Sequence, residues 1–412
     1  MAWSISVGNQ AQRTSRAAVA VSPAVADALL PLSRIANGHP SDEVSFEWRG
    51  DGAYKADIDL NALAETSDRA DAPTGWRDAL LAFANTPGLS ANPPDWGTYG
   101  SRTALRIYRP VMQEVEVMPG EDWKLECGIY ELTASAATGI QVRVIDTWSG
   151  KGWNGSAWAS NGILDSQSTE DTWKDISEEI TADPNRDERS TYQIIFEPIA
   201  SSYDATTYVY VSANGGSGSP AFYPKASLAA LIAHNIPLDA TVSIGSHAVT
   251  MTARSVTTMF SSAFLRTFRL DIAMPGGNQP RPKIGELWIG SPTTMLRGPM
   301  GGITLIEGDA YQNRLEAAQG RVEVLSDQKY PSQAMKLQVK TASEAAYEQW
   351  RNVVTRGSRF GAEPILLIPP DQLDGANRVL HGRVGPTISY TLPNAGWRTF
   401  EVEFVESPFP GA

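Results

Sequence analysis

Four tryptophans have the residue type and spacing for a binding surface. Trp148, Trp153 and Trp158 recur every five residues through a Gly-rich segment, and Trp173 follows. Flat aromatic faces stack on the apolar C–H side of a sugar ring, while nearby polar groups bond its hydroxyls. The pattern therefore predicts glycan contacts by these residues. Tryptophans packed across neighbouring strands of a sandwich would produce the same pattern, so both alternatives stay open at this point.

Motifs for metal binding or nucleotide chemistry are absent from the sequence. The 4 histidines lie in separate segments without an HExxH pattern, and there is a single cysteine, Cys127. A zinc site needs several such ligands close together. The sequence also lacks a P-loop, a GxGxxG turn after a strand and a GxSxG elbow. We predict no metal and no cofactor, and we expect Cys127 to be a small buried hydrophobic residue.

Carboxylates are numerous enough to conceal a glycosidase pair, which needs only two acids at the right separation. The pairs that share a strand face are Asp57 with Asp59 and Glu401 with Glu403. Alternation on a solvated strand face explains both pairs. We therefore predict no catalytic residues and a protein that is not an enzyme.

Charge and hydropathy exclude two classes of partner. The formal net charge is −12 and the pI is near 4.9, whereas nucleic-acid binding requires clustered Lys and Arg. No run approaches the roughly 18 apolar residues of a membrane helix, and the first residues do not form a secretory signal. We expect a soluble protein made in a cytoplasm, without nucleic-acid recognition or membrane insertion.

Composition and length indicate the elements that position these residues. Charged residues make up 19% of the chain, and Gly and Pro number 35 and 27, which is typical of many short strands joined by turns. At 412 residues the chain exceeds one ordinary core. The fold class predicted is mainly β, with several domains.

Strand alternation becomes clear after residue 40. Apolar and polar residues alternate in Val44 to Trp48 and again in Tyr54 to Leu60, separated by the turn Arg49-Gly50-Asp51-Gly52. We predict that these two strands pair. Arg49-Gly50-Asp51 matches an adhesion tripeptide, but we expect it only to form the turn. Residues 1–40 have no clear period and are predicted to form an arm or a strand segment.

A Trp-rich block interrupts this pattern. Residues 73–220 contain strands and turns at the spacing of a β-sandwich, and the block closes on a Gly/Ser-rich stretch at 214–220 that predicts a flexible linker. Alternating strands then return. The simplest arrangement is a discontinuous outer sandwich, made of 41–72 and 221–295, with 73–220 inserted into it.

The last part, 300–412, is predicted to be a small α+β domain. Its helix runs from Ser343 to Thr355 and starts with a capping box beginning at Thr341. Tyr347, Trp350 and Val354 lie at helical spacing on one apolar face.

Several segments resemble a known class of proteins. The stretches SRTALRIYRPVMQEVEVMPGEDWKLECGIYE, GIQVRVIDTWSGKGW and YVYVS resemble the carbohydrate-binding, galactose-binding-like jelly rolls of phage tail proteins. YKADIDLNALA, ASLAALIAHNIPLDATVSI and RTFRLDIAMPGGNQPRPKIGELWIG resemble a second galactose-binding-like sandwich of minor tail proteins in long-tailed phages. FGAEPILLIPP, RVLHGRVG and WRTFEVEFVESP are similar to the belt domain of distal tail proteins, although that domain usually comes first in the chain.

This resemblance implies a mechanical role in the tail tip or baseplate of the virion. It implies two galactose-binding-like sandwiches plus a belt-type domain, a homo-oligomeric ring, hexameric to match the tail tube, and partners among the baseplate proteins. Tyr347, Trp350 and Val354 would then lie in the ring interface, and the inserted module would contact host surface glycan. The alternatives are a receptor-binding adhesin and a tail-associated glycan hydrolase.

Overall fold

The structure is a computed structural model in which antiparallel strands dominate, and this confirms the mainly β fold class. It describes residues 3–14, 18–22, 29–31, 44–45, 53–63, 77–78, 94–168, 171–183, 189–234, 241–244, 247–250, 255–273, 283–296, 303–308, 313–316, 322–325, 332–359, 362–368, 379–385, 389–394 and 397–406. The turn at 49–52 lies outside these residues.

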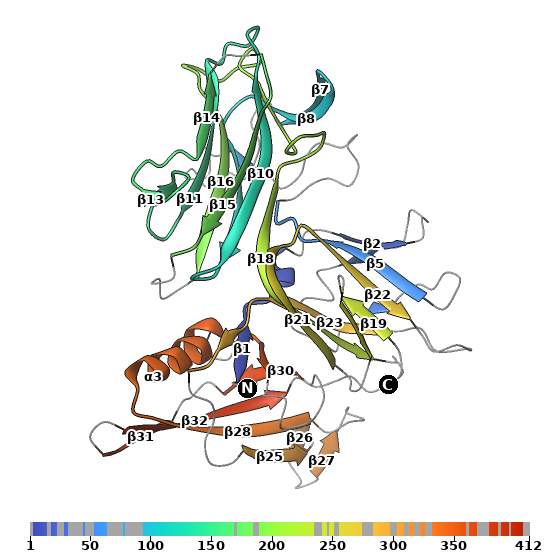
Figure 1. Cartoon of the computed structure of the whole chain (residues 1–412), viewed down its shortest axis with the longest axis vertical. Coiled ribbons are helices and arrows are strands. Elements are labelled where there is room, and N and C mark those ends of the chain that lie inside the picture. Colours follow the sequence, from blue (N-terminus) through green and yellow to red (C-terminus); the bar gives the residue numbers. More distant parts are fainter. Residues whose placement is uncertain are drawn as a thin grey trace. The chain divides into compact units, whose positions relative to one another are not determined.

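The chain divides into two compact units, which are considered separately (Figure 1). Unit 1 comprises Met1–Asp59, Ala226–Ala263 and Thr267–Ala412, and unit 2 comprises Leu60–Lys225 and Phe264–Arg266. The insertion predicted at 73–220 lies inside unit 2. Unit 1 takes in both the segments predicted for the outer sandwich and those predicted for the C-terminal domain.

Unit 2 contains two antiparallel sheets around one core. The first, which we call the tyrosine sheet, has the strand order β15-β10-β17-β8-β7. The first residues of β18 also pair with β10, on the edge that β17 occupies further along the strand. Its strands are β7 (Asp95–Tyr99), β8 (Arg102–Ile107), β10 (Asp122–Glu131), β15 (Lys174–Thr181), β17 (Val209–Ser212) and β18 (Ala221–His234).

The second sheet of unit 2, the hairpin sheet, has the order β13-β12-β11-β16-β9-β6, with β14 also on β11. Strands β11, β13, β14 and β16 are labelled in Figure 1. Its strands are β6 (Arg77–Asp78), β9 (Val111–Val117), β11 (Gly139–Asp146), β12 (Lys151–Trp153), β13 (Trp158–Ala159), β14 (Asp165–Ser168) and β16 (Ser190–Pro198).

Strand β10 shows how alternation builds the core between these sheets. Trp123, Leu125, Cys127 and Ile129 are fully buried, and the intervening residues face the other way. The indole of Trp123 stacks on Phe222 with 5.0 Å between ring centroids. Burial raises the pKa of the Cys127 thiol, and this side chain is the small buried hydrophobic residue that was predicted.

Unit 1 contains several antiparallel sheets. The largest has the order β24-β1-β29-β30-β32-β28-β25, with β31 on β32. Its strands are β1 (Ser4–Val7), β24 (Thr293–Thr294), β25 (Ile303–Gly308), β28 (Ser332–Thr341), β29 (Ile365–Ile368), β30 (Leu380–Val384), β31 (Ser389–Asn394) and β32 (Trp397–Glu406).

Two further sheets and a strand pair complete unit 1. One sheet has the order β20-β19-β22-β5-β2-β3. The other has the order β4-β23-β18-β21, in which β18 contributes its later residues. The strands are β2 (Ala18–Ser22), β3 (Leu29–Pro31), β4 (Val44–Ser45), β5 (Ala53–Asp59), β19 (Thr241–Ile244), β20 (His247–Thr250), β21 (Ser255–Phe264), β22 (Thr267–Ala273) and β23 (Lys283–Gly290), with the pair β26 (Asn313–Glu316) and β27 (Val322–Leu325).

The first residues of the chain form an integral strand of unit 1. Strand β1 lies between β24 and β29, and the short helix α1 (Gln10–Arg13) follows it. Asn9 is buried, and its side chain donates to Glu286 Oε1 (2.9 Å) and to the Leu287 carbonyl (2.8 Å). The arm alternative for residues 1–40 therefore does not describe residues 3 to 14.

Two predicted connections are wrong. Val44 and Ser45 pair with β23, whereas Ala53–Asp59 pairs with β2 and β22, so the two alternating segments do not pair with each other. Alternation shows which face of a strand is buried but does not choose its neighbour. Residues 214–220 are not a flexible linker but a tight turn between β17 and β18, where Gly218 N–H donates to the Thr103 carbonyl and Ser219 is buried.

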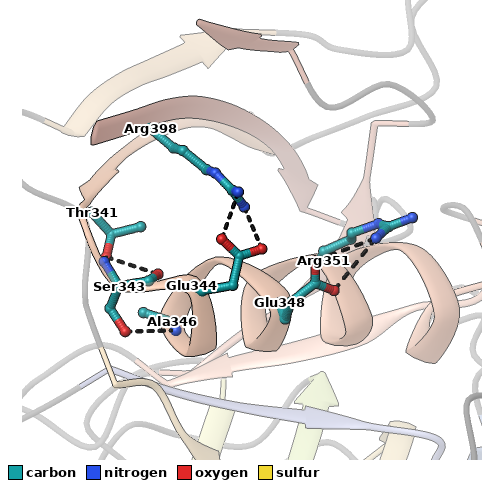
Figure 2. Close-up of polar contacts among 7 residues, drawn as sticks. All are labelled: Thr341, Ser343, Glu344, Ala346, Glu348, Arg351 and Arg398. Atoms are coloured by element: carbon teal, nitrogen blue, oxygen red, sulfur yellow. Dashed lines mark hydrogen bonds and ion pairs between the residues drawn. The ribbon is translucent and has the colours of Figure 1, made fainter. Parts of the chain in front are cut away.

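The predicted helix forms with different ends. Helix α3 (Glu344–Arg351) continues as a π-helical segment, Asn352–Gly357. Ser343, not Thr341, is the N-cap: its Oγ accepts from Ala346 N–H at 3.3 Å, while its own N–H donates to Thr341 Oγ1 at 3.0 Å (Figure 2). The N-cap lies two residues after Thr341, the predicted start of the capping box, because the Thr341 hydroxyl accepts from Ser343 N–H instead of from the helix.

Replacing this cap tests its role. Ser343→Ala removes the acceptor for Ala346 N–H, and we expect unit 1 to lose about 1 kcal/mol of stability, the usual cost of an N-cap hydroxyl. Chemical denaturation of the full chain would measure the loss. Ser343→Asn, which restores an acceptor, is the control, and an equal loss in both variants would contradict the capping role.

Candidate functional site

The four predicted tryptophans lie in three different surroundings. Trp153 and Trp158 pair across β12 and β13 with ring centroids 5.4 Å apart, and Trp153 is buried. Trp158 also packs on Tyr192, and its Nε1 donates to the Thr181 carbonyl at 3.0 Å. These two rings therefore pack across neighbouring strands, which was one of the two arrangements compatible with the sequence spacing. Their contact with a glycan stays a prediction.

Trp148 is exposed at the turn that joins β11 to β12. Its side chain is 59% accessible to solvent, the highest value among the tryptophans described. Asp146 organises the turn: its carboxylate accepts from Ser149 Oγ at 2.7 Å and its carbonyl accepts from Gly150 N–H at 2.8 Å. Gly150 has φ +68°, which a side chain would disfavour. Trp148 is thus an exposed ring on a hairpin whose turn is held by hydrogen bonds.

Trp173 belongs to a cluster of aromatic rings on the outer face of the tyrosine sheet. Alternation that sends Val209 and Val211 into the core sends Tyr208 and Tyr210 outward, and Tyr130 does the same on β10. We call this cluster the tyrosine surface. It is made of Tyr99, Tyr108, Tyr130, Trp173, Tyr208 and Tyr210.

The rings of the tyrosine surface support one another. Tyr130 and Tyr210 are buried, and Tyr99 packs on both, with centroid distances of 4.5 and 5.2 Å. Trp173 lies 5.2 Å from Tyr130, and Tyr208 lies 6.0 Å from Tyr210. Tyr99, Tyr108, Trp173 and Tyr208 are half-buried, so parts of their rings are open to solvent above a fixed floor.

Glycines under this surface let its side chains lie against the sheet. A Cβ on Gly97 would come within 3.2 Å of the Tyr210 ring. A Cβ on Gly128 would lie 2.7 Å from Arg102 Nη1 and 2.6 Å from Ser212 Oγ. A side chain at either position would push the ring of Tyr210 or the guanidinium of Arg102 away from its present place.

Two bidentate ion pairs flank the rings. Arg102 donates to both carboxylate oxygens of Asp175, at 2.7 and 3.0 Å, and its guanidinium carbon lies 4.7 Å from the Trp173 ring centroid. Arg106 donates to Asp95 at 2.8 and 2.5 Å. The hydrogen bonds from Arg102 lower the pKa of Asp175, so this carboxylate stays ionised.

The hydroxyls of Tyr108, Tyr130 and Tyr210 are protonated at neutral pH. Burial raises the pKa of Tyr108 and Tyr210, and burial with a hydrogen bond to Tyr99 raises that of Tyr130. A protonated phenol both donates and accepts a hydrogen bond. The surface therefore combines ring faces, hydroxyls and planar charged groups, which is the set that recognises sugar rings and their hydroxyls.

The helix face predicted for a ring interface covers the sheet of its own unit. Trp350 is buried and belongs to one apolar cluster with Ile365 and Phe404, and Tyr347 packs against that cluster. The Arg398 guanidinium lies over the Tyr347 ring at 4.4 Å. Val354 lies in the π-helical segment, and its side chain is outside the described residues. An interface role for these three residues stays a prediction.

Arg398 also braces the start of the helix. It pairs with Glu344 at 2.5 Å, and Glu348 with Arg351 at 3.4 Å lies one turn later (Figure 2). Both pairs are partly exposed, so each contributes little to stability by itself.

The described residues contain neither a metal-binding cluster nor a membrane-spanning helix. No three of their His, Cys, Asp and Glu side chains are grouped so that they could hold a metal ion. Within the same part of the chain, no helix has the length and apolar character needed to cross a membrane.

Of the residues in the tyrosine surface, the sequence pattern predicted only Trp173. The missed signal is the alternation Tyr208-Val209-Tyr210-Val211, which places two rings on one face of β17. Their partners come from residues 99, 130 and 173, and only the strand order brings these together.

Comparisons with known proteins place few limits on the chain. No family model and no curated protein matches the sequence. Among solved structures, the chain is similar to the N-terminal CBM22-1-CBM22-2 tandem domain from Paenibacillus barcinonensis Xyn10C, at 10% identity and a TM-score of 0.24. The match covers 56% of this chain and 95% of the other.

Proposed function

We propose that unit 2 is a non-catalytic glycan-binding module and that the sugar lies on the tyrosine surface. The observation that carries this proposal is a set of partly open rings on one outer sheet face, fixed by buried tyrosines and flanked by two bidentate Arg–Asp pairs. Rings preorganised in this way lose little conformational entropy when a ligand stacks on them. The sequence resemblance to galactose-binding-like jelly rolls agrees with this role.

Ring-removing variants test the module. We expect Tyr99→Ala and Trp173→Ala each to weaken binding to a glycan selected on an oligosaccharide array by about tenfold, or roughly 1.4 kcal/mol, the upper range for one aromatic contact. Calorimetric titration of the full chain with that glycan would measure the loss, and its thermal transition would show that unit 2 remains folded.

Trp148→Ala is the matched control, because it removes an exposed ring from the other sheet of unit 2. Loss of binding in Trp148→Ala alone would move the site to the β11–β12 hairpin. If neither the parent chain nor any variant binds a glycan on the array, the proposal is overturned.

We further propose that the chain is a structural component of a bacteriophage tail tip or baseplate, where it joins the tail tube to the tip. The support is the sequence resemblance of FGAEPILLIPP, RVLHGRVG and WRTFEVEFVESP to belt domains. Weak sites repeated around a ring would gain affinity through multivalency.

Negative-stain imaging and light scattering of the purified chain, alone and mixed with tail tubes, test this second proposal. A hollow ring, free or on the tube end, is the expected result. An isolated trimer with fibrous extensions would favour a receptor-binding adhesin, and release of reducing sugar would favour a hydrolase. A monomer that does not bind tail tubes would overturn the belt assignment.

A further inference from the structure

We infer that the glycan recognised by the tyrosine surface is uncharged, an inference that rests on the proposed function of this surface. Acidic glycans carry carboxylate, sulfate or phosphate groups and need cations that are free to pair with them. On the tyrosine sheet, Arg102, Arg106 and Lys124 are already paired with carboxylates.

Two arginines on this face are occupied by carboxylates of the same chain. Arg102 and Arg106 each form a two-point pair, with Asp175 and Asp95 respectively. Lys124, on the same face of β10, pairs with Glu126 at 3.1 Å. An incoming anion would have to displace one of these carboxylates, and charge-assisted two-point pairs are the strongest of the hydrogen-bonded contacts.

The more accessible partner in both arginine pairs is the carboxylate. The Asp175 side chain is 37% exposed against 15% for Arg102, and Asp95 is 43% exposed against 34% for Arg106. Asp171, two residues from Trp173, adds another exposed carboxylate, held by the backbone N–H and hydroxyl of Thr133. The charge presented to a ligand is therefore negative, which repels acidic sugars.

The same arrangement suits sugar hydroxyls. A carboxylate offers up to four lone-pair sites, and the side chains of Asp175 and Asp95 are partly exposed, so a sugar hydroxyl can reach them. A neutral sugar can donate its hydroxyls to them and stack its C–H face on Tyr99 or Trp173 without breaking either ion pair. Gly128 keeps the Arg102–Asp175 pair flat against the sheet, beside the rings.

Paired probes at low and high ionic strength test the inference on the full chain. The neutral probes are immobilised manno-, galacto-, cello- and xylo-oligosaccharides, and the acidic probes are oligogalacturonate, sialyllactose and glycerol teichoic acid. We expect binding to a neutral probe that changes little with salt, because no net charge is neutralised. Tighter binding to an acidic probe, weakened by salt, would overturn the inference and leave the proposed function standing. Binding to no probe would instead count against the proposed function.

The double variant Asp95→Asn/Asp175→Asn tests the cause. It removes the negative charge that neutralises each guanidinium while keeping side-chain size, and we expect affinity for the acidic probes to rise roughly tenfold, the scale of one charge-assisted hydrogen bond. Glu116→Gln is the control, since it opens the Arg189–Glu116 pair (2.6 Å) on the hairpin sheet of the same unit. An unchanged neutral preference in a folded double variant, or an equal rise in the control, would show that these carboxylates do not set the charge class.

Discussion

Deleting residues 1–14 is expected to abolish cooperative folding of unit 1. The deletion removes β1 from between β24 and β29 and takes away the buried side chains of Trp3 and Ile5. Burial of each such side chain is worth roughly 1.5–3 kcal/mol, and a whole domain is stable by only about 5–15 kcal/mol. Hydrogen exchange measured along the chain should show loss of protection in β29 and β30.

Unit 2 provides the internal control for the deletion, because none of the deleted residues belongs to it. Its strands β10 and β16 should keep their protection. Full protection of β29 in the deleted chain would show that the first strand is dispensable, as an arm that orders only on assembly would be.

A single substitution at Asn9 tests the hydrogen bonds that join the first residues of the chain to β23. Asn9 also accepts from Ile289 N–H at 3.1 Å and from Ala11 N–H at 3.0 Å, so Asn9→Ala removes four hydrogen bonds from buried groups. The fully buried Glu286 is the costliest of them. We expect a loss of about 2–4 kcal/mol from unit 1, measured by denaturant unfolding, and a loss below about 0.5 kcal/mol would contradict this account.

Trp123→Ala is expected to have the largest effect on unit 2. The indole is fully buried, stacks on Phe222, and donates from Nε1 to Glu121 Oε2 at 3.2 Å. Truncating a buried Trp costs about 3–5 kcal/mol through lost burial and the cavity left behind. Denaturant unfolding with hydrogen exchange along β10 would measure this loss.

Trp148→Ala is the matched control for that experiment, because it removes the same side chain from an exposed turn. We expect a change within about 0.5 kcal/mol. Similar losses in the two variants would mean that the burial of Trp123 does not support the unit.

Patterns along one strand or one helix could be predicted from the sequence. Alternation in Trp123 to Ile129 predicts a strand with Cys127 inside, and the structure confirms both. The polar-to-apolar spacing of residues 343–355 predicts a helix, although its cap and its end differ. These features depend on neighbours a few residues away, so local geometry determines them.

Pairing between distant segments was decided only by the tertiary structure. Alternation in Val44–Ser45 and Ala53–Asp59 is compatible with a hairpin, yet their partners are β23 in one case and β2 and β22 in the other. The same limit applies to β1, whose partner β29 lies more than 350 residues later. Hydrophobic pattern selects a face, and the choice of neighbour depends on how all strands share one core.

For the candidate site too, some features follow from the sequence and others only from the tertiary structure. The sequence by itself determined that the chain is acidic and β-rich, and that it carries closely spaced tryptophans. The tertiary structure decided which of them meet: it paired Trp153 with Trp158 across two strands and brought Tyr99, Tyr130, Trp173 and Tyr210 onto one sheet face. The physical reason is that a side chain's face follows from a period of two, whereas its neighbours follow from strand order and register.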